Sequence, residues 1–94
     1  MRRVPSQFSW VDHRLVRNHY LEYAQASSWG LYLVLVTVSN EHGLSFYSDK
    51  TLGRLLGLSA EQIGVCRLEL TRIGVLAYAS PMYQVLSLEE ADAP

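Results

Sequence analysis

Three histidines and one cysteine are the residues of this 94-residue chain that most often bind metals or act as nucleophiles. His13 and His19 are six residues apart, so on a helix they point in different directions, and His42 falls in a predicted turn. Cys66 is the single cysteine, so a disulfide or a cysteine-based metal site is not expected, and we predict a small core residue. The motifs of phosphate-binding loops and hydrolase nucleophiles are missing. The sequence therefore predicts no enzyme, no metal site and no cofactor.

The charges of the chain are nearly balanced but unevenly spread. The formal net charge is −1. Residues 1–47 hold four arginines against three acidic residues, and residues 48–83 hold four cations against three acidic residues. The end of the chain adds Glu89, Glu90 and Asp92 with no cation. A dedicated DNA-binding domain is usually basic, so the overall charge does not by itself favour nucleic acid.

Length and composition predict one globular domain. The hydrophobic content of 49% is normal for that class. Met1-Arg2-Arg3 is not followed by the apolar segment of a secretion signal. The longest apolar run, Leu31–Val38, is too short to span a bilayer. We therefore expect a cytoplasmic protein with no membrane partner.

The N-terminal part is predicted to be a flexible lead-in over residues 1–8 and a helix over about 10–26. Ser9 and Asp12 have the spacing of a capping box. The apolar stripe of this helix covers a wide arc, wider than one small core needs, which suggests packing against a second copy in a homodimer. The stripe consists of Leu15, Val16, His19, Tyr20 and Tyr23.

The next segment, SSWGLYLVLVTVSNEHG, fits two structures. Its β-branched residues favour a strand, whereas Ser27 or Ser28 could cap a helix and Gly43 could end one. Periodicity cannot decide for a run that is apolar on every side, although its length slightly favours a helix. The residues LSFY after Gly43 predict a short extended piece.

Two short helices separated by Gly57 are predicted over about 48–73. Ser48 begins the first helix, and Ser59 with Gln62 forms a capping box that begins the second. Gly74 ends the second helix. The buried stripe of the second helix is expected to consist of Ile63, Cys66, Leu70 and Ile73. Two β-type runs then flank Ser80-Pro81 and predict a hairpin over about 75–88, followed by a disordered acidic tail over 89–94.

This order of elements resembles the winged helix-turn-helix superfamily. The resemblance rests on Tyr47–Leu88: the Ser-led helix, the Gly57-Leu58-Ser59 turn, the spacing of Ile63 and Leu70, Gly74, and two strands around a tight wing. The chain is also similar to the winged-helix domains of bacterial replication-initiation and primosome proteins and of proteins linked to mobile elements. The resemblance implies a mainly α fold with a small β-hairpin (α+β) and an extra N-terminal helix, as one domain over 9–88. It also places a core helix at about 28–40.

In that superfamily the helix after the turn enters the DNA major groove, which implies the same place for Ala60–Ile73. A DNA-binding role in transcription regulation or replication initiation would then rest mainly on phosphate contacts. Four such contacts predict a slope of log affinity against log salt of about −3.6, and roughly a hundredfold loss of affinity between about 50 and 200 mM salt. The candidate DNA-binding residues are Lys50, Arg54, Gln62, Arg67, Thr71 and Arg72.

A protein partner is the alternative. The outward side of the second helix is a poor reader of base edges, because Val65 and Leu68 interrupt its polar residues. The wing tip, Ala79–Met82, holds no cation. The candidate residues for a protein interface or a homodimer are Val65, Leu68, Tyr20 and Tyr23. Exposure of Val65 and Leu68 would favour this alternative.

Overall fold

The structure, a computed structural model, describes residues 10–88; the predicted lead-in (1–8), Ser9 and the predicted tail (89–94) lie outside the described residues. Within the described part, four α-helices and a three-stranded antiparallel sheet confirm the predicted α+β class. The elements are α1 (Arg14–Arg17), a 3-10 helix (Tyr20–Tyr23), α2 (Ala26–Val38), β1 (Leu44–Phe46), α3 (Asp49–Leu56), α4 (Ala60–Arg72), β2 (Leu76–Ala79) and β3 (Met82–Val85).

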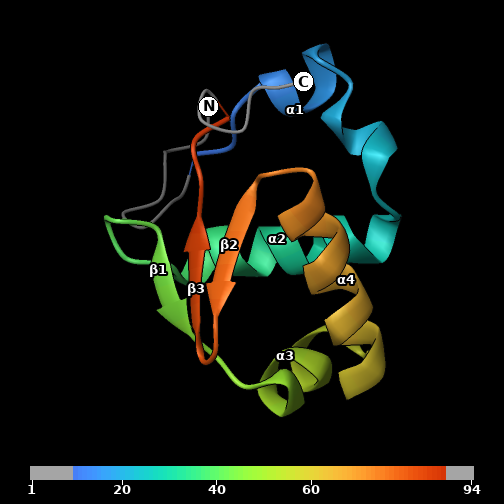
Figure 1. Cartoon of the computed structure of the whole chain (residues 1–94), viewed down its shortest axis with the longest axis vertical. Helices are drawn as coiled ribbons and strands as arrows, with labels where there is room; N and C mark the ends of the chain where they lie inside the picture. Colours follow the sequence, from blue (N-terminus) through green and yellow to red (C-terminus); the bar gives the residue numbers. More distant parts are fainter. Residues whose placement is uncertain (1–9, 89–94) are drawn as a thin grey trace, which may run out of the picture.

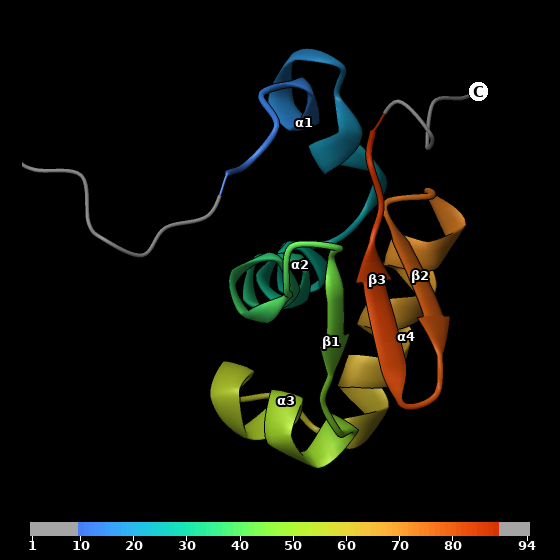
Figure 2. The same ribbon diagram turned by 90° about the vertical axis from the view of Figure 1, so that its left-hand side faces the viewer.

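The sheet has the strand order β1-β3-β2. β2 and β3 form the predicted hairpin, with Tyr78 opposite Tyr83 and a cis bond between Ser80 and Pro81 in its turn. The predicted extended piece is β1, which pairs with β3 so that Ser45 lies opposite Tyr83. In both views the β2–β3 turn lies at the same end of the molecule as α3, whereas α1 lies at the other end (Figures 1 and 2).

The core lies where α2, α4 and the sheet meet. α2 packs against α4 and β3, and α4 also packs against α3 and β2. α2 crosses behind the sheet in Figure 1. Burying one large aliphatic side chain stabilises the fold by about 1.5–3 kcal/mol, so these contacts fix α4 in place. The side chains with no exposed surface include Leu31, Leu35, Leu52, Ile63, Leu70, Val75 and Tyr83.

The ambiguous segment is helical, and α2 begins two residues before the predicted start. Its N-cap, Gln25, makes no side-chain capping bond. Glu69 of α4 does this work instead, because its Oε1 accepts hydrogen bonds from the Gln25 N–H and from the hydroxyl of the buried Ser28. These bonds lower the pKa of Glu69. The start of α2 is therefore capped by a residue 44 positions away in the sequence.

The prediction of one helix over 10–26 is wrong. The chain forms the four-residue α1, turns at His19 with φ of 63°, and continues as a 3-10 helix. The predicted stripe contains the right residue types, but in this segment only Leu15 is fully buried, and Val16 and Tyr23 are exposed. A continuous helix needs its apolar side to pack against another element, because short helices are marginal in water. Histidine tolerates the left-handed turn better than most residues.

The predicted capping box at the start of this segment pairs Asp12 with Ser9, which lies outside the described residues. Asp12 accepts a hydrogen bond from the Arg14 backbone N–H and pairs with its guanidinium at 2.6 Å. The side-chain bond from Arg14, with the backbone bond second, lowers the pKa of Asp12 to about 2. Asp12 therefore orders the first turn of α1 together with Arg14.

Candidate nucleic-acid interface

The turn between α3 and α4 is set by local residues. The Ser48 hydroxyl accepts the Thr51 N–H at the start of α3, and Gly57 ends this helix with φ of 71°. Both halves of the predicted capping box at Ser59 and Gln62 are present, at 3.1 and 2.8 Å. The Gly57 break and the Ser59 capping box are thereby confirmed.

Gly53 makes the close approach of the turn to α3 feasible. A Cβ atom at this position would clash with the carbonyl oxygen of Leu58. The Leu58 N–H in turn donates to the Gly53 carbonyl at 2.9 Å. The atoms nearest to such a Cβ belong to the backbone of Leu58 and Ser59, so they cannot rotate away as a side chain would. Residue spacing alone does not single out Gly53, because the need for glycine arises from this tertiary approach.

α4 has a buried and an uncovered side. Ile63, Cys66 and Leu70 are buried as predicted, and Ile73 is partly buried. Val65 and Leu68 are 51% and 50% exposed. Val65 lines a groove between α4 and the start of α2, whereas Leu68 lines a groove between α4 and β2. The two aliphatic residues therefore border different neighbouring elements but, three residues apart, lie on the same uncovered side of α4.

Arg67 is held by contacts inside the protein. Its Nη1 donates to Asp49 Oδ1 at 2.7 Å and to the Tyr83 hydroxyl at 2.9 Å. The guanidinium also lies over the Tyr78 ring, 4.4 Å from its centre. The side chain is only 20% exposed. Desolvation opposes the charge, but the hydrogen bonds to Asp49 and Tyr83 outweigh it and raise the pKa of Arg67.

The remaining candidate cations are in a different situation. Lys50 and Arg54 on α3 and Arg72 in the last turn of α4 are exposed and form no ion pair with residues 10–88. Gln62 is exposed, with its carbonyl oxygen used in the capping box. The Thr71 hydroxyl donates to the Leu68 carbonyl at 2.9 Å. Three cations are therefore available to an outside partner on α3 and α4.

The two aromatic candidates lie on the N-terminal segment, away from α3. Tyr20 is half-buried and packs against the core, whereas Tyr23 is exposed. The Trp29 indole N–H donates to the Leu21 carbonyl, which ties the 3-10 helix to α2. Tyr23 therefore remains available for a partner, while Tyr20 serves the fold.

One comparison with known proteins finds the same arrangement of elements. A crystal structure of a transcriptional regulator of the CRP/FNR family from Thermus thermophilus superposes with a TM-score of 0.54 and 20% sequence identity. The match covers 81% of this chain, which spans 43% of the length of that regulator. No family model and no curated protein sequence matches the chain.

The fold is a winged helix. In this winged helix α3 and α4 form the helix-turn-helix, and the β2–β3 hairpin is the wing. The wing is short, because two residues join its strands. In Figures 1 and 2 the start of α4, α3 and the wing turn all lie at one end of the molecule. This end and the uncovered side of α4 form the candidate interface.

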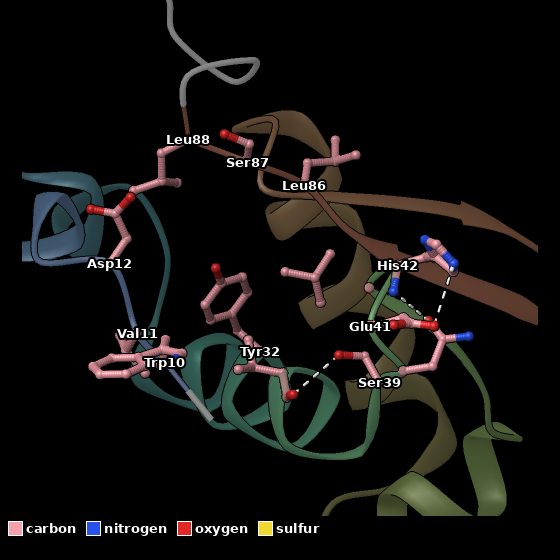
Figure 3. Close-up of a pocket in the computed structure, with 14 residues that line it drawn as sticks. Trp10, Val11, Asp12, Tyr32, Ser39, Glu41, His42, Leu86, Ser87 and Leu88 are labelled. Atoms are coloured by element: carbon pink, nitrogen blue, oxygen red, sulfur yellow. Dashed lines mark hydrogen bonds and ion pairs between the residues drawn. The ribbon is translucent and has the colours of Figure 1, made fainter. Parts of the chain in front are cut away.

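A hollow of about 740 Å³ lies at the far end of the winged helix, between the N-terminal segment and the ends of α2 and β3. In Figure 3 Tyr32 points into this hollow, and its pKa is raised by burial and by Asp12. The Asp12 carboxylate is already bound to Arg14, and Glu41 and His42 are mostly exposed. The polar groups around the hollow therefore do not converge on one ligand position.

Two further kinds of feature are absent from residues 10–88, a metal-binding cluster and a membrane-spanning helix. No three or more His, Cys, Asp or Glu side chains within residues 10–88 are placed to hold a metal ion. No helix in that range has the length and apolar character required to cross a membrane. Cys66 is buried, with its sulfur 3.6 Å from the Ser27 hydroxyl.

Proposed function

We propose that this winged helix binds duplex DNA through the uncovered side of α4, with modest sequence specificity. The observation that carries the proposal is the presence of three exposed cations on α3 and α4, the two helices of the helix-turn-helix. Lys50 and Arg54 lie on α3, and Arg72 lies in the last turn of α4. A helix of this length extends roughly 20 Å, which exceeds the major-groove width of about 12 Å. With cations on α3 and in the last turn of α4, we expect phosphate contacts on both edges of the groove.

Phosphate contacts are expected to dominate over base readout. Glu61 repels phosphates, and Val65 offers only an apolar surface, suited at most to a thymine methyl group. Gln62 and Thr71 are the uncharged polar candidates for base edges. Three phosphate contacts predict a salt slope of about −2.7 and a loss of affinity of about fortyfold between roughly 50 and 200 mM salt.

Regulation of transcription is the setting that we propose. The support comes from the structural likeness to a protein described as a transcriptional regulator. Initiation of replication would use the same DNA-binding surface and is the alternative setting. Footprinting on the DNA that surrounds the gene for this chain would separate a promoter site from an origin site.

An NMR titration with a short duplex of arbitrary sequence tests the DNA-binding function. At low salt we expect chemical-shift changes centred on Lys50, Arg54 and Arg72, and these changes should weaken as salt is raised. The exposed Arg17 on α1 provides an internal control, because it lies outside the proposed interface. Perturbations confined to α1, or none at low salt, would contradict the proposal.

Protein interaction, including homodimer formation, is the second candidate function. The half-exposed Val65 and Leu68 favour it, since exposed aliphatic residues on a helix often contact protein. Under this alternative Val65→Glu or Leu68→Glu disrupts an assembly that light scattering detects for the unmodified chain at high concentration. A monomer at every concentration would remove the homodimer.

A further inference from the structure

Arg67 lies where three parts of the winged helix meet. It extends from α4, binds Asp49 in the first turn of α3, and contacts both strands of the wing through Tyr78 and Tyr83. The two tyrosines lie directly opposite each other in the wing, with ring centres 4.6 Å apart. The Arg67 side chain therefore connects α3, α4 and the wing by polar contacts.

A phosphate contact would require Arg67 to leave these partners. Its guanidinium would have to break bonds to Asp49 at 2.7 Å and to the Tyr83 hydroxyl at 2.9 Å. Tyr83 has no exposed surface, so its hydroxyl would lose a partner inside the protein. The planar guanidinium suits this site, because it can bind a carboxylate and a hydroxyl while stacking on a ring. A lysine ammonium offers no planar group for the stacking contact.

We propose that Arg67 is a positioning residue, which fixes the angle between α3, α4 and the wing and supports DNA binding without touching DNA. This inference rests on the proposed function. It assigns the electrostatic contacts with DNA to Lys50, Arg54 and Arg72. It also assigns Asp49 a supporting role, because Asp49 is the acidic partner that holds the guanidinium in place.

Substitution of Asp49 distinguishes two alternative roles of Arg67, phosphate contact and positioning. The two roles predict changes in DNA affinity of opposite sign. If Arg67 contacts phosphate, Asp49→Asn removes the carboxylate that competes with DNA for its guanidinium, so binding tightens. We call the contacts of Arg67 with Asp49, Tyr78 and Tyr83 the junction. If Arg67 positions the wing, Asp49→Asn loosens this junction and binding weakens. Substitutions that act on binding without contacting the ligand change affinity by roughly two- to thirtyfold.

The experiment measures affinity for a short duplex of arbitrary sequence at several salt concentrations. We expect Arg67→Gln and Asp49→Asn each to weaken binding by roughly two- to thirtyfold, with the salt slope of the unmodified chain. The double variant should bind no more weakly than either single variant, because both changes break one junction. The matched control, Arg72→Ala, should instead lower the magnitude of the slope by about 0.9.

Three results would overturn the inference: tighter binding by Asp49→Asn, a slope lowered by about 0.9 in Arg67→Gln, or unchanged affinity in both variants. Tyr83→Phe serves if either variant fails to fold, because it removes only the hydroxyl that accepts from Arg67. It should weaken binding at an unchanged slope, and an unchanged affinity would count against the inference.

The readout also separates this inference from the proposed function. If the unmodified chain binds no duplex at low salt, the DNA-binding function fails. The junction is then judged by amide hydrogen exchange in β2 and β3. Faster exchange in Asp49→Asn would support the junction, and unchanged exchange would overturn it.

Discussion

Arg67 and Arg72 lie on one helix, five residues apart, in opposite surroundings. Arg67 belongs to the inner side of α4 (Ile63, Cys66, Arg67, Leu70), which contacts the core, α3 and the wing. Arg72 belongs to the outer side (Val65, Leu68, Arg72), which is exposed. The inner side fixes the helix, whereas the outer side remains available to a partner. Residue type alone does not separate these roles.

Loss of packing on the inner side should have the largest effect. Leu70→Ala is expected to lower the free energy of unfolding by about 2–5 kcal/mol, because it leaves a cavity in the core. Leu68→Ala on the outer side is the matched control, and its change should stay within about 0.5 kcal/mol. Urea unfolding of both variants measures the difference. Similar losses in the two variants would remove the distinction between the sides.

The turn that sets the angle of α4 should respond next. Gly53→Ala is expected to cost about 3 kcal/mol, because the new Cβ would clash with the Leu58 carbonyl. Gly57→Ala should cost about 1 kcal/mol, because Gly57 has a positive φ but open space around it. Thermal unfolding of the two variants gives the comparison. A larger loss in Gly57→Ala would show that backbone conformation matters more here than the close approach.

The smallest expected effect on stability concerns Glu69 and depends on pH. The Ser28 hydroxyl, followed by the Gln25 N–H, holds the pKa of Glu69 below its ordinary value of 4.5. A lowered pKa in the folded state stabilises the fold above pH 4.5, and this contribution is lost as the pH falls through the folded-state pKa. Glu69→Gln should therefore be less stable than the unmodified chain at neutral pH, with a difference that shrinks in acid.

Denaturant titrations of both proteins between neutral pH and strong acid measure this difference. Asn40, whose Oδ1 accepts two nearby backbone N–H groups, provides a neutral control, because Asn40→Ala should show no such pH dependence. A stability difference for Glu69→Gln that grows in acid would contradict the assigned direction.

Local signals in the sequence predicted the helix-turn-helix well. The Ser59–Gln62 capping box, the Gly57 break and the buried residues of α4 depend on neighbours within a few positions. The contacts of Arg67 involve partners 16 and 18 residues away, and those of Glu69 partners 41 and 44 residues away. Such contacts exist only after the helices and the wing have packed together, so spacing could not reveal them.

In the N-terminal segment, the sequence instead predicted a continuous helix that does not form. Its apolar spacing is typical of an amphipathic helix, yet a pattern forms a helix only where another element covers it. Leu15 reaches the core, but Val16 and Tyr23 do not. Sequence spacing could not show how little core surface was available to this segment.

The salt dependence of DNA affinity tests the central claim most directly, because it counts the cations that meet phosphate. For the unmodified chain we predict a slope of log affinity against log salt of about −2.7, and for Arg72→Ala about −1.8. A slope of about −3.6 would indicate a fourth phosphate contact, which we would assign to Arg67. Affinity that does not change with salt, or no binding at low salt, would contradict the account.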